Sequence, residues 1–186
     1  MSIKFKIAFL FAVIVTLLMV ALGFYVYFYS AKERADTFNT RLKNRALSTA
    51  RVFASASTNP IQVLKQIDNA TVASLYNKSI TILDDHDLHE YMFSDIVGDS
   101  LLLKKDVIEN AKKETEYLFN YNGRKAIALS YSGPEKQFIV AVAALDIDGK
   151  EYLQQLKNIL WIAVILAFVL SFFSGMLFAK NHHQSY

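Results

Sequence analysis

The chain contains no cysteine, only two prolines and only six glycines in 186 residues. Without cysteine there can be no disulfide bond, no thiolate nucleophile and no thiol redox chemistry, and the chain can fold in an oxidising compartment without mispairing. The sequence also lacks a nucleophile elbow and a glycine-rich phosphate-binding loop. These absences argue against an enzyme.

Charged residues are missing from two long stretches, residues 7–29 and residues 159–179. Each stretch is long enough to cross about 30 Å of hydrocarbon, for which a helix needs roughly 20 residues. The first exceeds the roughly 7–15 apolar residues of a cleaved signal sequence, so we expect an uncleaved anchor. Aromatic residues that favour the headgroup layer stand at matching ends of the two stretches, namely Tyr25, Tyr27 and Tyr29 in the first and Trp161 in the second. The sequence therefore predicts two transmembrane helices.

Two spans place both chain ends on one side of the membrane. We expect residues 1–6 and 180–186 to be cytoplasmic tails and residues 30–158 to form an extracytoplasmic domain. Basic residues that follow the first span favour the opposite orientation, but segments longer than about 60 residues translocate largely regardless of charge. Because Lys4, Lys6 and Lys180 are the only charged residues outside it, the loop holds 17 basic and 17 acidic residues. Its net charge of zero argues against nucleic acid as a partner.

The loop divides into a long helix and a mixed core. Residues 31–57 contain no proline or glycine and carry apolar residues at helical spacing, so they predict a helix that continues out of the first span. Asn59-Pro60 ends this helix and starts a second one. Residues 79–146 then alternate between short β-prone runs and turns, including Asn122-Gly123, a pair typical of a type I′ hairpin turn.

The expected fold is therefore α+β, with about five antiparallel strands in one sheet and helices on a face. We expect the sheet to be completed by a central buried strand near residues 138–145, apolar on both faces. Ser100 is the expected N-cap of a helix that runs to about Thr115. Asp148 is the expected N-cap of the last helix, with Glu151 as its reciprocal partner. No helix-breaking pattern follows before Ala179, so strand, cap and membrane helix are joined without a flexible linker.

Small residues recur at four-residue intervals along the second span. Such a row lets two helix backbones approach closely in lipid, where packing drives association. Because a four-residue row drifts around a helix of 3.6 residues per turn, we expect two contacts, one with the first span and one with a dimer mate. The predicted helix-packing residues are Ala163, Ala167, Ser171, Gly175 and Ala179.

Two groups of side chains are candidate binding sites. Carboxylates and imidazoles around one hairpin turn could hold a divalent cation, although a solvated turn also favours aspartate. These candidate metal ligands are Asp84, Asp85, His86, Asp87 and His89. Aromatic residues of the sheet could converge on one face and bind a small molecule, although aromatic residues also dominate ordinary cores. These candidate ligand-binding residues are Tyr91, Tyr117, Tyr121, Tyr131 and Phe138. No other cofactor is expected.

The chain resembles the amino-terminal sensor region of bacterial membrane-bound histidine kinases of two-component systems. The resemblance covers roughly residues 1–180 and implies a PAS-like or Cache-like sensor domain, a homodimer and a place in the bacterial inner membrane. The segments that carry it are Met1-Ser2-Ile3-Lys4, Arg41-Leu42-Lys43-Asn44-Arg45-Ala46, Thr49-Ala50-Arg51, Leu75-Tyr76-Asn77, the hairpin from Ile80 to Phe93, and Asn158-Ile159-Leu160.

Kinases of this kind continue past the second span into a dimerisation helix with a phosphoacceptor histidine and then an ATP-binding domain. In this sequence His182 and His183 have no such surroundings, so we assign them no catalytic role. We therefore expect a sensing module whose kinase output lies elsewhere. The alternative is a membrane-anchored accessory protein that binds another envelope protein and senses nothing.

Overall fold

The computed structural model describes residues 3–55, 60–70, 75–84, 88–133 and 137–181. The chain forms two compact units. One unit consists of the two chain ends, up to Arg34 and from Asp148 onward, and the other runs from Ala35 to Ile147. We call them the helix pair and the sheet domain.

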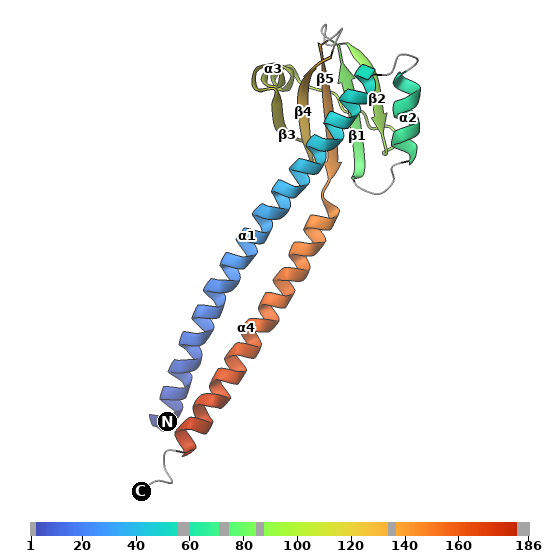
Figure 1. Ribbon diagram of the computed structural model, residues 1–186. Coiled ribbons are helices and arrows are strands. Elements are labelled where there is room, and N and C mark those ends of the chain that lie inside the picture. Colours follow the sequence, from blue (N-terminus) through green and yellow to red (C-terminus); the bar gives the residue numbers. More distant parts are fainter. Residues whose placement is uncertain (1–2, 56–59, 71–74, 85–87, 134–136, 182–186) are drawn as a thin grey trace. The chain divides into compact units, whose positions relative to one another are not determined.

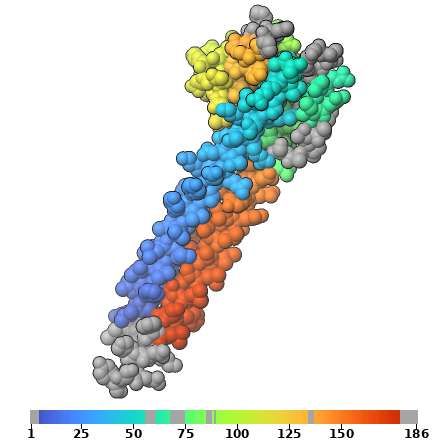
Figure 2. Space-filling model, viewed as in Figure 1, coloured from blue at the N-terminus to red at the C-terminus, as the bar shows by residue number. Residues whose placement is uncertain are grey.

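The helix pair contains segments of the longest helices in the described chain. Helix α1 runs from Ile3 to Ser55 and helix α4 from Ile147 to Asn181 (Figure 1). Within the pair, the two helices lie side by side and run antiparallel, with their side chains in contact in the space-filling view (Figure 2). Both helices are long and apolar enough to cross a membrane. The predicted spans lie inside them.

The sheet domain contains five antiparallel strands. In spatial order they are β2, β1, β5, β4 and β3, so the last strand in sequence is the central one. This arrangement confirms the predicted α+β class, the strand number and the central position of the buried strand. The strands are β1 (Tyr76–Leu83), β2 (His89–Ser94), β3 (Glu116–Tyr121), β4 (Arg124–Ser132) and β5 (Gln137–Leu145).

Helices cover both faces of the sheet. On one face, Phe38, Leu42, Ala46 and Ala50 of α1 pack on a buried cluster that includes alternate residues of β1, β4 and β5. Helix α2, Pro60–Ala70, contributes Leu64 to the same cluster. We call this side of the sheet the α1 face.

The other face carries helix α3, Lys105–Glu114, whose Val107, Ile108 and Ala111 pack against a second cluster of strand residues. We call this side the α3 face. The residues of β4 on this face are small, Ala126 and Ala128, and β5 adds alanines, so a short helix can lie close to this part of the sheet. The expectation of helices on a single face is therefore wrong.

Two helix starts differ from the predictions. Helix α3 begins at Lys105, its cap residue Lys104 makes no side-chain capping bond, and Ser100 lies outside it. Helix α4 begins at Ile147, so Asp148 lies within the first turn and is not the cap. The Asn122-Gly123 turn is confirmed, since both residues have the positive φ values that a type I′ turn requires, +47° and +76°.

Candidate functional site

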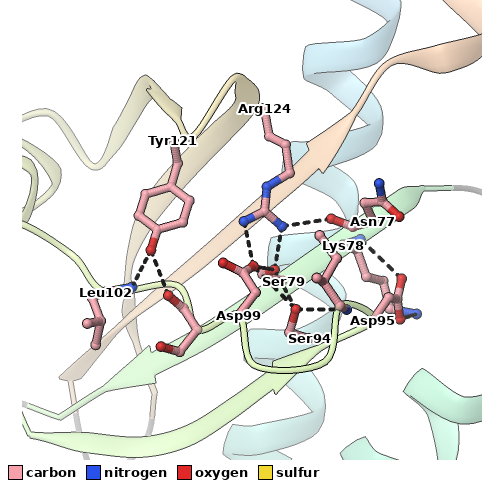
Figure 3. A network of polar contacts seen from close by, with 11 residues as sticks. Asn77, Lys78, Ser79, Ser94, Asp95, Asp99, Leu102, Tyr121 and Arg124 are labelled. Atoms are coloured by element: carbon pink, nitrogen blue, oxygen red, sulfur yellow. Dashed lines mark hydrogen bonds and ion pairs between the residues drawn. The ribbon is translucent and has the colours of Figure 1, made fainter.

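A buried charged network lies on the α3 face, where β4 begins and the segment after β2 crosses the sheet (Figure 3). The tight Asn122-Gly123 turn starts β4 at Arg124, and strand alternation places Arg124 on the same face as Ala126 and Ala128. The side chain of Arg124 is only 4% exposed. An arginine buried to this extent requires partners for its charge and its donors.

Three acceptors surround the Arg124 guanidinium. Nη1 donates to the carbonyl oxygen of Asn77 at 2.9 Å and to Ser79 Oγ at 2.6 Å. Nη2 forms an ion pair with Asp99 Oδ2 at 2.5 Å. Ser79 Oγ lies 2.8 Å from the same carboxylate oxygen and 2.9 Å from Ser94 Oγ. The network thus joins β1, β2, β4 and the segment that carries Asp99.

Burial of Asp99 tends to raise the pKa of its carboxyl group, because a charged group loses solvation there. Hydrogen bonds from Arg124 and Ser79, together with the positive charge of Arg124, outweigh this effect and lower the pKa below its ordinary value. Asp99 is therefore ionised at neutral pH. Asp99 and Arg124 bind each other and their polar neighbours. The network therefore fastens a loop to the sheet and offers no free acid or base for catalysis.

A second charged contact lies beside the first, on the opposite face of β1. Lys78 Nζ is 3.7 Å from Asp95 Oδ1 and 5.2 Å from the centroid of the Phe93 ring. Burial lowers the pKa of the Lys78 ammonium, and the positive charge of Arg45 lowers it further, while Asp95 opposes both. Two hydrogen bonds hold these residues together: the Asp95 amide donates to the Lys78 carbonyl oxygen at 2.9 Å, and the Lys78 amide donates to Asp95 Oδ2 at 3.1 Å.

The Arg124 network is not predicted by the sequence. Its only sequence signal is a charged residue in phase with Ala126 and Ala128 of β4. Asp99 and Ser79 are distant from Arg124 in sequence, and no spacing rule connects the three. Only the strand order, which places β1 beside β5 and β5 beside β4, brings them together.

The five aromatic residues proposed as a ligand site do not converge on one face. Tyr91 and Phe138 are buried on the α1 face, where Tyr131 packs against them. Tyr117 and Tyr121 pack on the α3 face. The physical reason is the register: Tyr117 pairs with Ala128, so it shares the face of Ala128, whereas Tyr131 is an odd number of residues further along β4 and points to the other side.

Each described aromatic group has a packing role. Phe138 lies 5.2 Å from Phe53 and 5.4 Å from Tyr131, measured between ring centroids. The Tyr121 hydroxyl donates to the carbonyl oxygen of Ser100 at 2.6 Å, which ties down the same loop as Asp99. Ligand binding by these residues stays a prediction. It now applies separately to the aromatic residues on the α1 face and to those on the α3 face.

The proposed metal ligands lie mostly outside the described residues. This applies to Asp85, His86 and Asp87 and to the side chain of His89. Asp84 is described, and its Oδ1 accepts a hydrogen bond from the Leu88 amide at 2.8 Å, as in a closed turn. Within the described residues, no three His, Asp or Glu side chains are grouped so that they could hold a metal ion. Metal binding at the hairpin stays a prediction.

Open cavities occur on the sheet domain. One of ≈ 590 Å³ lies between α1 and the edge strand β3, beside an ion pair between Lys43 and Glu116. Another of ≈ 310 Å³ lies near the start of β5, where Asp84, Lys112 and Phe138 contribute to its wall. Each has room for a small molecule by volume, since such sites span about 300–1,000 Å³. Each is also lined by only one of the five aromatic candidates.

The predicted helix-packing residues lie on α4. Gly175 contacts the first span so closely that a Cβ added to it would lie 2.9 Å from both Cα and Cβ of Ala8. Ala8 and Ala12 are fully buried within the helix pair. Ala163, Ala167 and Ser171 are partly buried. The side chain of Ala179 lies outside the described part of the chain, and a contact with a dimer mate stays a prediction.

Comparison of the chain with the known protein families and with curated proteins finds no match. The resemblance to histidine-kinase sensor regions therefore remains an expectation based on the segments quoted above.

Proposed function

We propose that this chain is the membrane-anchored sensing module of a two-component sensor histidine kinase. It would work as a homodimer in the bacterial inner membrane, with the sheet domain outside the cytoplasm. A stimulus that acts on the sheet domain would pass along α4 to a kinase core. This proposal assigns the chain a receptor role and no catalysis of its own.

The observation that carries the proposal is the way in which β5 leads into α4. Only Asp146 separates the end of the central strand at Leu145 from the start of the helix at Ile147. From there α4 is uninterrupted to Asn181. A displacement of β5 therefore has no flexible linker in which to be absorbed, whereas glycine- and serine-rich linkers would uncouple the two elements.

Helix α1 supports the same proposal from the other end of the domain. It continues without a break from its apolar amino-terminal part into residues such as Phe38 and Leu42, which are buried in the sheet core. Both connections between the apolar segments and the sheet thus run through helix, with only Asp146 between β5 and α4. A stimulus can shift such a system only if it binds one arrangement of the helices better than another.

A phase experiment tests this proposal without knowledge of the stimulus. One to four alanines are inserted between Gln154 and Gln155 in a chimera that joins the chain after Asn181 to a histidine-kinase core. Each inserted residue rotates the following helix by about 100° and advances it by about 1.5 Å. We expect autophosphorylation in membranes to rise and fall with the helical period.

The matched control places the same insertions at the turn after Asn122, where added residues extend an exposed hairpin. With these insertions, autophosphorylation should not vary periodically with the number of inserted residues. Autophosphorylation that is indifferent to the α4 insertions would contradict signal transmission and would favour a membrane-anchored accessory protein.

A further inference from the structure

The two helices of the helix pair separate along their length and leave a groove. They are in tight contact where Gly175 meets Ala8, since no Cβ would fit there. Further along, a Cβ added to Gly23 would lie 3.8 Å from Leu160 Cδ2, which is ordinary contact. A groove of ≈ 400 Å³ opens at this level, between residues of α1 and α4.

The groove has one apolar end and one polar end. Val20 and Phe24 of α1 and Val164 of α4 line its apolar part. Because the helices are antiparallel, Tyr27 and Lys157 both lie further toward the sheet-proximal end of their segments, and they line the groove there. Within the described residues, Lys157 forms no ion pair. A single cation therefore stands at the end of an otherwise apolar channel.

This polarity matches a phospholipid, in which an apolar chain leads to a negatively charged phosphate. Trp161 also lines the groove and is 60% exposed. Tryptophan and tyrosine favour the headgroup layer, so Trp161 and Tyr27 place the polar end of the groove at the depth of lipid phosphates. The groove thus offers an apolar channel that matches the acyl chain of a lipid. At its polar end it offers the Lys157 ammonium group, which matches the lipid phosphate.

We propose that this groove binds one acyl chain of an anionic membrane phospholipid, with Lys157 contacting the phosphate of its headgroup. The proposal rests on the membrane placement in the proposed function. A second copy of the chain is a poorer occupant, because its apolar segments 7–29 and 159–179 carry no acidic residue that could pair with Lys157. A helix with side chains is also about 10–12 Å across, whereas an acyl chain is slender.

The chain contains its own reporter, because Trp161 is the only tryptophan. The full chain is reconstituted into phosphatidylcholine vesicles that contain increasing fractions of a lipid with brominated acyl chains, which quench nearby tryptophan. The brominated lipid carries either a phosphatidylglycerol or a phosphatidylcholine headgroup. We expect the anionic lipid to compete for the site about fivefold better, the effect of one lysine near a phosphate layer.

Two variants separate the headgroup contact from the channel. In Lys157→Gln, the ratio by which the anionic lipid competes better than phosphatidylcholine should fall from about five to about one. Gly23→Leu should fill the channel and weaken quenching by the anionic lipid toward that of bulk lipid. The matched control Lys150→Gln removes a lysine of the same helix that does not line the groove, and it should keep the preference.

Four results would overturn the proposal. Equal quenching by the two lipids in the unmodified chain would show that the groove does not select an anionic headgroup. An unchanged preference in Lys157→Gln would show that Lys157 does not contact the headgroup. Loss of quenching as the protein density in the vesicles rises would assign the groove to a second copy. Absence of quenching by any brominated lipid would additionally contradict the membrane placement and hence the proposed function.

Discussion

The helix pair and the sheet domain distribute polar and apolar side chains in opposite ways. In the helix pair, large apolar residues such as Leu18, Leu22 and Leu170 are more than half exposed, and Gly175 lies so close to Ala8 that no Cβ would fit between them. In the sheet domain large apolar residues fill two cores, and a buried arginine pairs with a partly buried aspartate. In water, burial of apolar area stabilises a fold, whereas in lipid close packing of small residues does so. This difference fits the proposal that the helix pair lies in lipid and the sheet domain in water.

The largest effect should come from breaking the buried pair of the sheet domain. Arg124→Met leaves the Asp99 carboxylate, whose side chain is 17% exposed, without its cation. The loss should approach but not exceed the about 3–5 kcal/mol that removal of one partner of a fully buried pair costs, because water reaches Asp99. We expect this loss in the free energy of unfolding, measured by chemical denaturation of the full chain in micelles. The exposed Arg51→Met is the control and should change little. Equal stability of the two variants would show that the network contributes nothing.

The double variant Arg124→Met with Asp99→Leu sharpens this test. Replacing both partners of a buried ion pair by apolar residues is often neutral or stabilising. We therefore expect the double variant to recover most of the stability lost in Arg124→Met. If it is less stable than the single variant, the hydroxyl groups of Ser79 and Ser94 need a charged partner.

The next effect belongs to the helix pair. Gly175→Leu forces the backbones apart, because even a Cβ would lie 2.9 Å from Ala8. Such overpacking costs about 1–3 kcal/mol. The chain has no cysteine, so a Phe5→Cys and Phe172→Cys pair, at positions whose rings are 5.5 Å apart between centroids, can report helix proximity by disulfide formation in membranes. We expect slower cross-linking in Gly175→Leu and an unchanged rate in the control Ser174→Leu, which replaces an exposed neighbour.

A smaller, pH-dependent effect should appear only in the sheet domain. The pKa of Asp99 is lower in the folded chain than in the unfolded chain, so the unfolded state binds its proton first as the pH falls. The stabilisation by Asp99 is therefore complete above the unfolded pKa of about 3.9 and is lost as the pH falls below it. Denaturation curves between about pH 6 and pH 3 should show this loss. Asp99→Asn should flatten the dependence, and an identical slope in that variant would assign the acid sensitivity to other carboxylates.

The smallest effect should come from the exposed ion pair between Lys43 and Glu116, whose side chains are 44% and 47% exposed. Pairs of this kind contribute about 0–1 kcal/mol because water and salt screen them. Lys43→Gln should therefore change the free energy of unfolding by less than about 1 kcal/mol. A loss as large as that of Arg124→Met would show that this pair, and with it the contact between α1 and β3, is more important than its exposure implies.

Periodicity and turn chemistry predicted the elements of the sheet domain more reliably than their ends. The alternating pattern and the Asn122-Gly123 turn predict the β3–β4 hairpin because both are local properties of the chain. Ser100 failed as a helix cap because its carbonyl oxygen accepts a hydrogen bond from Tyr121, a residue 21 positions away. A local rule cannot anticipate a partner at that separation.

The candidate sites show the same limit. The local sequence places Tyr117 and Tyr131 on strands. It does not determine which of the two side chains faces α1. That choice follows from the pairing of Tyr117 with Ala128, which is a tertiary fact. Gly175 was predicted as a packing residue because small residues at regular spacing are a local signal, but its contact with Ala8 required both helices.

The sequence by itself determined the two long apolar helices, the α+β class and the five strands, because hydrophobic period and uncharged length are properties of consecutive residues. Only the tertiary structure decided that Arg124, Asp99 and Ser79 form one buried network and that Lys157 stands at the end of an apolar groove. These arrangements depend on strand order and on the antiparallel helix pair, which bring together groups that are far apart along the chain.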